Sequence, residues 1–205
     1  MKNYKPLPLE QGNYYHIYNR GNNSINVFFD NESYRYFLKL LEKYTSPIAD
    51  IYAWCLLKNH FHILVYIRIE KEIKFDKLKY STVEKAKVLD ASKQFGHLFN
   101  AYTQAINKKF NRTGSLFEKR FSRKLVSSSI YLKNLICYIH YNPVKHGFAS
   151  KMSLYHWSSF NDIFSTEQST LRRDDVIEIF GGKEHFLAYH MQQQNGNAIN
   201  ESILE

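Results

Sequence analysis

The sequence predicts an α+β fold with one four-stranded antiparallel sheet and helices on one face of that sheet. Short segments rich in β-branched and aromatic residues alternate with longer segments whose apolar residues recur at helical spacing. The order of these segments is strand, helix, strand, strand, helix, strand. A chain of 205 residues that is 44% hydrophobic can bury one sizeable core and carry a small appendage.

The first strand and the first helix are marked by clear boundaries. Residues 14–20 are rich in strand formers and stop at Gly21. Residues 32–44 then place their apolar side chains at helical spacing, so we expect a helix that Asp30 caps and Pro47 ends.

Two neighbouring apolar segments predict an antiparallel hairpin. Residues 50–57 and 60–67 are dense in Ile, Tyr, Trp, Leu and Val, and Lys58-Asn59 stands at the break between them. Because both segments are apolar almost throughout, we expect both strands to lie centrally in the sheet.

The second half of the sheet domain repeats the pattern. Apolar residues at helical intervals predict a helix over residues 83–109, which Gly96 could interrupt, and residues 117–126 read as a half-buried strand. A last helix over residues 130–141 is expected to end before Pro143, since proline disfavours helix in the residue before it. This order is the split βαβ, ferredoxin-like arrangement.

The remaining sequence predicts smaller units. We expect a main domain over residues 1–150, a helical C-terminal appendage over residues 151–191, and a flexible polar tail over residues 192–205.

The charge balance favours a polyanionic partner. Lys and Arg outnumber Asp and Glu by 28 to 19, which gives a formal net charge of +9 and a pI near 9.4. Sixteen Tyr and fifteen Phe could add stacking faces for bases, although most Phe must fill the core. Nucleic acid is the leading partner class, while an ordinary basic surface would explain the charge alone.

The cysteines and the apolar runs indicate the compartment. Cys55 and Cys137 are too far apart in the sequence to suggest a disulfide framework or a Cys metal motif. No signal-peptide core follows Met1, and no apolar run approaches the roughly 20 residues that span a bilayer. We expect a cytoplasmic protein without a membrane partner.

Two pairs of residues could carry chemistry. His60 and His62 open a strand two residues apart, so both imidazoles point to one face and make half of a metal site. Tyr138 and Asn142 are one helical turn apart, and an amide oxygen can complete a metal's shell. Taken alone, each pair is equally explained by hydrogen-bonded histidines and by ordinary packing.

Five ordered segments together resemble the REP-associated tyrosine transposases, relatives of the single-tyrosine HUH insertion-sequence transposases. The resemblance extends over roughly residues 14–190. Its segments are Tyr-His-Ile-Tyr-Asn-Arg-Gly at 15–21, Ala-Trp-Cys-Leu-Leu-Lys-Asn-His-Phe-His-Ile-Leu-Val at 53–65, Arg-Thr-Gly-Ser-Leu-Phe-Glu-Lys-Arg-Phe at 112–121, Tyr-Ile-His-Tyr-Asn-Pro-Val-Lys-His-Gly at 138–147 and His-Trp-Ser-Ser-Phe at 156–160.

This resemblance implies a catalytic domain over residues 1–150, in which His60, His62 and Asn142 bind Mg²⁺ or Mn²⁺ and Tyr138 is the nucleophile. The implied activity is cleavage and transfer of single-stranded, hairpin-containing DNA through a 5′-phosphotyrosine intermediate. Tyr102 stays open as a rival nucleophile, but Ile106, four residues later, offers no ligand. A base that activates the tyrosine is not evident, although His140 is a candidate.

The resemblance also implies a monomer or a homodimer that exchanges the nucleophile helix. Lys58 departs from the pattern, since many relatives carry Pro there. Basic residues are expected along the DNA, with Arg112 and Arg120 foremost, although each is equally explained as a solvated surface charge. The candidates are Arg20, Lys58, Arg112, Lys119, Arg120, Arg123, Lys124 and Lys145.

Three other readings remain. A ferredoxin-like module could bind structured nucleic acid through its sheet without cutting it. A replication-initiator or relaxase type of HUH nuclease would share the chemistry, but its histidine-rich third-ligand motif is not evident. A zinc hydrolase is least favoured, because no HExxH motif or cysteine cluster accompanies His60 and His62.

Overall fold

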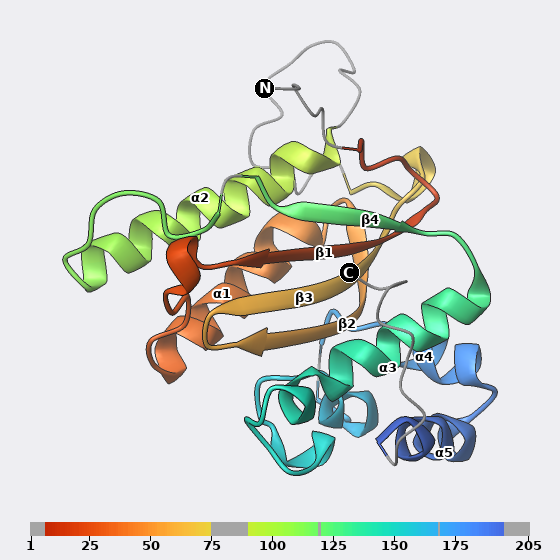
Figure 1. Ribbon diagram of the computed structural model, residues 1–205. Coiled ribbons are helices and arrows are strands. Elements are labelled where there is room, and N and C mark those ends of the chain that lie inside the picture. Colours follow the sequence, from red (N-terminus) through yellow and green to blue (C-terminus); the bar gives the residue numbers. More distant parts are fainter. Residues whose placement is uncertain (1–6, 75–89, 119, 168, 195–205) are drawn as a thin grey trace.

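The structure is a computed structural model that describes residues 7–74, 90–118, 120–167 and 169–194. It contains the expected four-stranded antiparallel sheet, in the strand order β2-β3-β1-β4 (Figure 1). Reading along the chain, this is the split βαβ arrangement that the sequence predicts. Its elements are β1 (Tyr14–Arg20), α1 (Asn31–Thr45), β2 (Ala49–Leu57), β3 (His60–Ile67), α2 (Ala91–Lys109) and β4 (Ser122–Val126).

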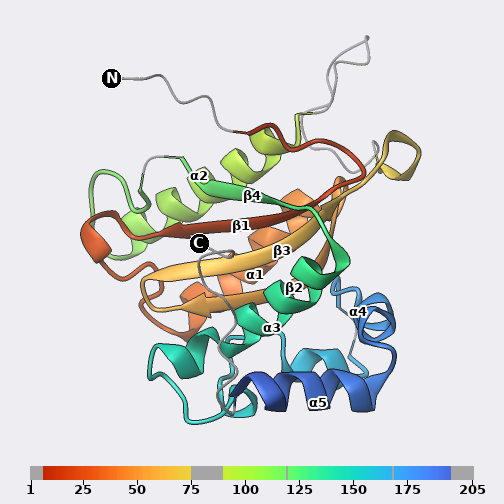
Figure 2. The same ribbon diagram turned by 45° about the vertical axis from the view of Figure 1, so that its right-hand side comes forward.

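The sheet has two differently covered faces. On one face, Phe61 of β3 packs against Phe37 of α1 and Phe99 of α2, with ring centroids 5.1 and 5.3 Å apart. The opposite face, which carries His62, lies against Tyr138 of a further helix, α3 (Ser129–Lys145). Figure 2 shows the sheet between α1 and α2 on one side and α3 on the other. Because successive side chains of a strand alternate between faces, the core and the histidines are separated.

The expectation that both hairpin strands are central is wrong for β2, which is an edge strand. The chain after residue 156 runs along its outer edge and covers it. Backbone hydrogen bonds join the two: Ser159 N–H to Trp54 O (2.9 Å), Leu56 N–H to Trp157 O (2.9 Å) and Arg172 N–H to Ile51 O (2.8 Å). This cover pairs polar groups that an edge otherwise exposes, and it explains why β2 is as apolar as a central strand.

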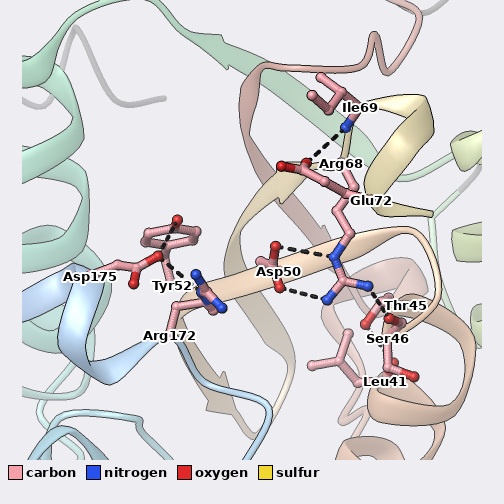
Figure 3. A network of polar contacts seen from close by, with 10 residues as sticks. All are labelled: Leu41, Thr45, Ser46, Asp50, Tyr52, Arg68, Ile69, Glu72, Arg172 and Asp175. Carbon is pink, nitrogen blue, oxygen red and sulfur yellow. Dashed lines mark hydrogen bonds and ion pairs between the residues drawn. The ribbon is translucent and has the colours of Figure 1, made fainter. Parts of the chain in front are cut away.

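Polar side chains make two sets of contacts in the first half of β2 (Figure 3). The Arg68 guanidinium binds both carboxylate oxygens of Asp50, at 2.7 and 3.1 Å. Near the appendage, the Tyr52 hydroxyl donates to Asp175 at 3.0 Å, and Arg172 donates to the same carboxylate at 2.9 Å. Hydrogen bonds to charged groups are the stronger kind, so the Tyr52–Asp175 contact holds the appendage against the sheet, while the Arg68–Asp50 pair joins β2 to the chain that follows β3.

α3 continues past the point where the sequence predicts its end. Pro143 lies inside the helix, and the ladder resumes beyond it, since His146 N–H donates to Asn142 O at 3.0 Å. A proline nitrogen removes one hydrogen bond only, and burial of Asn142 and Pro143 against the sheet offsets that loss. Asn142 is therefore an interior residue of the helix and not its last residue.

Two further boundaries differ from expectation. β4 begins at Ser122, five residues later than predicted, because Arg120 has a positive φ of 60° that a strand cannot contain. α2 begins at Ala91 after an Asp90 cap, and it passes through Gly96 without interruption. The predicted helical residues 83–89 lie outside the described part of the chain.

The appendage consists of short helices packed on β2 and α3. Residues 192–194, predicted as tail, belong to its last helix, and residues 195–205 lie outside the described part. No helix among the described residues is long and apolar enough to cross a membrane. The helices of the appendage are α4 (Arg173–Phe180) and α5 (Lys183–Gln194), and its 3₁₀ turns are Met152–Leu154 and Asn161–Phe164. Two further 3₁₀ turns, Asn22–Ser24 and Glu70–Glu72, lie in the main domain.

Candidate active site

A cavity of about 560 Å³ opens on the histidine face of the sheet, beside α3. Strands β1 and β3, the loop before β4, and α3 with the residues after it all contribute to its wall. Its lining residues are Tyr18, Asn19, Arg20, Asn59, His60, Phe61, His62, Glu118, Ser122, Tyr138, His146 and Phe148.

His60 lines this cavity and contacts the side chain of Asn142, which is buried beside it. His60 Nδ1 lies 2.8 Å from the side-chain oxygen of Asn59, which can only accept, so His60 carries its proton on Nδ1. Its Nε2 therefore presents a lone pair, 3.4 Å from Asn142 Oδ1. Two acceptors at this separation match adjacent ligands of one ion, which lie about 3 Å apart when each bond is about 2.1 Å.

His62 lies next to His60, with the ring centroids 5.3 Å apart and the rings nearly perpendicular. Its Nδ1 is 2.9 Å from Nε2 of His16, a buried residue of β1. Burial lowers the pKa of His62 well below its ordinary value, and the neighbouring His16 and His60 lower it further. His62 therefore stays neutral at physiological pH, the state in which an imidazole binds a metal.

Tyr138 reaches the same cavity from α3. Its ring stands edge-on to His62, with centroids 5.5 Å apart, and the Lys145 ammonium lies 5.5 Å from the ring centroid. Tyr138 and Asn142 share one face of α3 because they are four residues apart. The helix thus delivers a phenol and an amide to the two strand histidines.

The donor set fits a divalent metal of mixed nitrogen and oxygen preference. Among the described residues, no group of three or more His, Cys, Asp or Glu side chains could hold an ion, so a site here needs the Asn142 amide. Asn142 is fully buried, and its Nδ2 has no hydrogen-bond partner. Burying an unpaired amide group costs roughly 1 to 3 kcal/mol, which is expected where the residue is held for function.

The two other residues considered for the chemistry lie elsewhere. Tyr102 is fully buried on the opposite face of the sheet, where its hydroxyl donates to Val27 O at 3.0 Å and burial raises its pKa. His140 points away from the cavity toward the appendage and bonds His190 and Ser159, both at 2.9 Å. The suggestion that His140 activates the tyrosine is wrong for this arrangement.

The basic residues named from the sequence divide into two groups. Arg20 lines the cavity beside Glu118, and Lys145 stands over Tyr138. Lys124 shares their face, since it pairs with His16 across β1 and β4.

The others lie apart from the cavity. Lys58 is exposed in the β2–β3 turn, Arg120 lines a neighbouring hollow, and Arg112 lies over Phe29. Arg123 is on the opposite face, where its guanidinium lies over Phe121. Lys119 is outside the described part of the chain.

The sequence alone did not single out three residues of this site. His16 alternates with Tyr14 and Tyr18 along β1, and that spacing places it on the histidine face. Glu118 forms an ion pair with Arg20 at 3.4 Å, and the His146 ring lies 5.1 Å from the His60 ring. Only His16 could have been found from the sequence, through the alternation of side chains along a strand. Glu118 lies in an irregular segment and His146 at the end of a helix, where no periodicity indicates the direction of a side chain.

The chain is similar to known proteins in part of its sequence and in its fold. No protein-family profile matches the chain. A Haemophilus influenzae protein named as a REP-associated tyrosine transposase is 26% identical over 110 residues, which are 53% of this chain and 57% of that protein. A solved structure described as a REP-associated tyrosine transposase bound to a REP hairpin has a TM-score of 0.58 at 18% identity and covers 89% of this chain and 98% of the other. The chain is therefore similar in sequence, over about half its length, and in fold to the REP-associated tyrosine transposases.

Proposed function

We propose that this protein is a metal-dependent, single-strand DNA endonuclease and strand-transferase that acts on hairpin-containing DNA through a 5′-phosphotyrosine intermediate. The observation that carries the proposal is the convergence of Tyr138, His60 and His62 on one cavity, with the buried Asn142 Oδ1 3.4 Å from His60 Nε2. The similarity to REP-associated tyrosine transposases supports the substrate class, because the solved relative is described as bound to a REP hairpin.

The chain's own residues define the reaction. The Tyr138 oxygen bonds to the scissile phosphorus, the bond from phosphorus to the 3′ oxygen breaks, the phenol proton is lost, and the 3′ oxygen leaves as a hydroxyl. His60, His62 and Asn142 would hold Mg²⁺ or Mn²⁺, which when bound would polarise the phosphate. Another 3′-hydroxyl can reverse the step on a second strand, since the covalent link keeps the phosphodiester's energy.

The positive charge around the cavity suits a phosphate backbone. Arg20 lines the cavity with its side chain half exposed, and the Lys145 ammonium stands over the nucleophile. Fixed cations near the reacting phosphate stabilise charge that develops in the transition state. Lys58, Arg112 and Arg120 are proposed to contact DNA further from the reacting group, whereas Arg123, which lies over Phe121 on the opposite face, is not part of this surface.

The direct test is incubation with single-stranded, hairpin-containing DNA from around its own gene, labelled at either end, with Mn²⁺ or with a chelator. We expect the protein to be joined covalently to the 5′ phosphate of the fragment downstream of the cut, and the upstream fragment to carry a free 3′-hydroxyl, both only with the metal. Tight binding of hairpins without any cut would instead favour the non-catalytic nucleic-acid-binding module.

Metal binding has its own test in protein stability. An ion that binds only the folded state adds about 1.4 kcal/mol to the free energy of unfolding at ten times its dissociation constant. Calorimetry should show that Mn²⁺ raises the unfolding temperature of the wild type but not of Asn142→Leu, which has no ligand oxygen. An equal rise in both proteins would remove Asn142 from the metal site.

A further inference from the structure

We propose that His16 is a positioning residue that accepts a hydrogen bond from His62 and so fixes the tautomer in which His62 Nε2 keeps its lone pair. His16 lies on β1, outside the histidine pair and the nucleophile helix. The consequence for metal binding rests on the proposed function, whereas the tautomer itself does not.

The contact between the two imidazoles is close and shielded. His16 Nε2 lies 2.9 Å from His62 Nδ1, and the rings are stacked with centroids 5.0 Å apart and planes at 27°. His16 is 1% exposed, so water does not compete for the bond. The rings of Tyr18 and Tyr138 lie 4.8 and 6.3 Å from the His16 ring and limit its rotation.

A hydrogen bond between two neutral imidazoles requires one donor and one acceptor, so only two arrangements exist. If His16 donates, His62 must carry its own proton on Nε2 and has no lone pair left for a ligand. If His62 donates through Nδ1, its Nε2 lone pair is free. Only the second arrangement leaves His62 able to bind a cation at the cavity.

The neighbouring histidine supports the second arrangement. Asn59 Oδ1 already fixes the proton of His60 on Nδ1, so His60 presents Nε2 toward Asn142. With His16 as an acceptor, both strand histidines present the same nitrogen. Two different partners, an amide on the turn and an imidazole on β1, would thus prepare the two rings for one ion.

The choice of an imidazole has an electrostatic consequence. The more usual partner of a metal-bound histidine is a carboxylate, a backbone carbonyl or water. A carboxylate at position 16 would bring a negative charge into a buried site that must receive a polyanion. A neutral His16 orients His62 without that repulsion, and Lys124 lies opposite it on β4.

A matched pair of variants tests this role. His16→Gln can place its amide oxygen where His16 Nε2 lies and still accept from His62, whereas His16→Met has similar length and volume but accepts only weakly. Titration of Mn²⁺ followed by its electron paramagnetic resonance should give an affinity within about threefold of wild type for Gln. The Met variant should bind 10- to 100-fold more weakly, the loss typical of such outer partners.

The tautomer can be read without metal. Long-range ¹H–¹⁵N spectra of the metal-free wild type should show His62 protonated on Nδ1, with the peak assigned through its loss in His62→Gln. Protonation of His62 on Nε2, or a folded Met variant that binds Mn²⁺ like wild type, would overturn the inference. If the wild type binds no Mn²⁺, the proposed function fails, and the His62 tautomer still decides the role of His16.

Discussion

Tyr138→Phe is expected to abolish the covalent protein–DNA adduct, a loss of at least about a thousandfold in cleavage. Removal of a nucleophilic oxygen leaves no group to form the bond, and only residual catalysis from the rest of the site remains. The phenylalanine ring keeps the packing against His62 and beneath Lys145, so the fold and hairpin binding should be retained. Denaturing gels that resolve the adduct, with a mobility shift for binding, measure both effects.

Tyr102→Phe is the matched control. It removes a hydroxyl that donates to Val27 O on the other face of the sheet, which should cost about 1 kcal/mol of stability and leave the adduct intact. An adduct that persists in Tyr138→Phe and disappears in Tyr102→Phe would reverse the two assignments. That result would require the core around Tyr102 to open.

The second large effect is a loss of stability in acid that arises at the appendage. Polar hydrogens form a directed chain, because Phe186 O can only accept and so takes the proton of His190 Nδ1, at 2.8 Å. His190 Nε2 must then accept from His140 Nδ1, and His140 Nε2 from the Ser159 hydroxyl, each at 2.9 Å. Every proton in this buried chain is assigned, so neither imidazole can take up another without breaking a bond.

The pH dependence follows from the direction of the pKa shifts. Burial lowers the pKa of His190 to about 4 and that of His140 well below its ordinary value. An unfolded histidine titrates near 6.5, so below that pH the unfolded chain binds more protons than the folded one. The contribution of His190 to the free energy of unfolding should be fully present above about pH 6.5. As the pH falls to 4, the free energy of unfolding should decrease by about 3 kcal/mol from His190 alone.

Urea unfolding at a series of pH values measures this loss. His190→Gln can still accept from His140 but does not titrate, so its stability should depend less steeply on pH between 6.5 and 4. Parallel curves for the variant and the wild type would show that His190 does not control the acid transition.

Local sequence patterns determined most of the secondary structure. The strand at residues 14–20, the Asp30 cap and the strand at residues 60–67 follow from strand propensity, side-chain capping and apolar patterning, which depend on near neighbours. The element order then restricts the topology to few possibilities, and the observed strand order agrees with it. The two-residue spacing of His60 and His62, and the four-residue spacing of Tyr138 and Asn142, likewise required no tertiary information.

Tertiary structure decided what lies next to these residues. β2 reads as a central strand because the appendage covers its edge, and α3 runs through Pro143 because burial offsets one lost hydrogen bond. His16 meets His62 only through the pairing of β1 with β3, 46 residues apart in the chain. His140, two residues after Tyr138 in the sequence, faces away from it because two residues rotate the side chain by about 200° around the helix axis. The periodicity of a helix or strand determines which of its side chains lie on the same face. The contacts of those side chains depend on which other elements pack against that face.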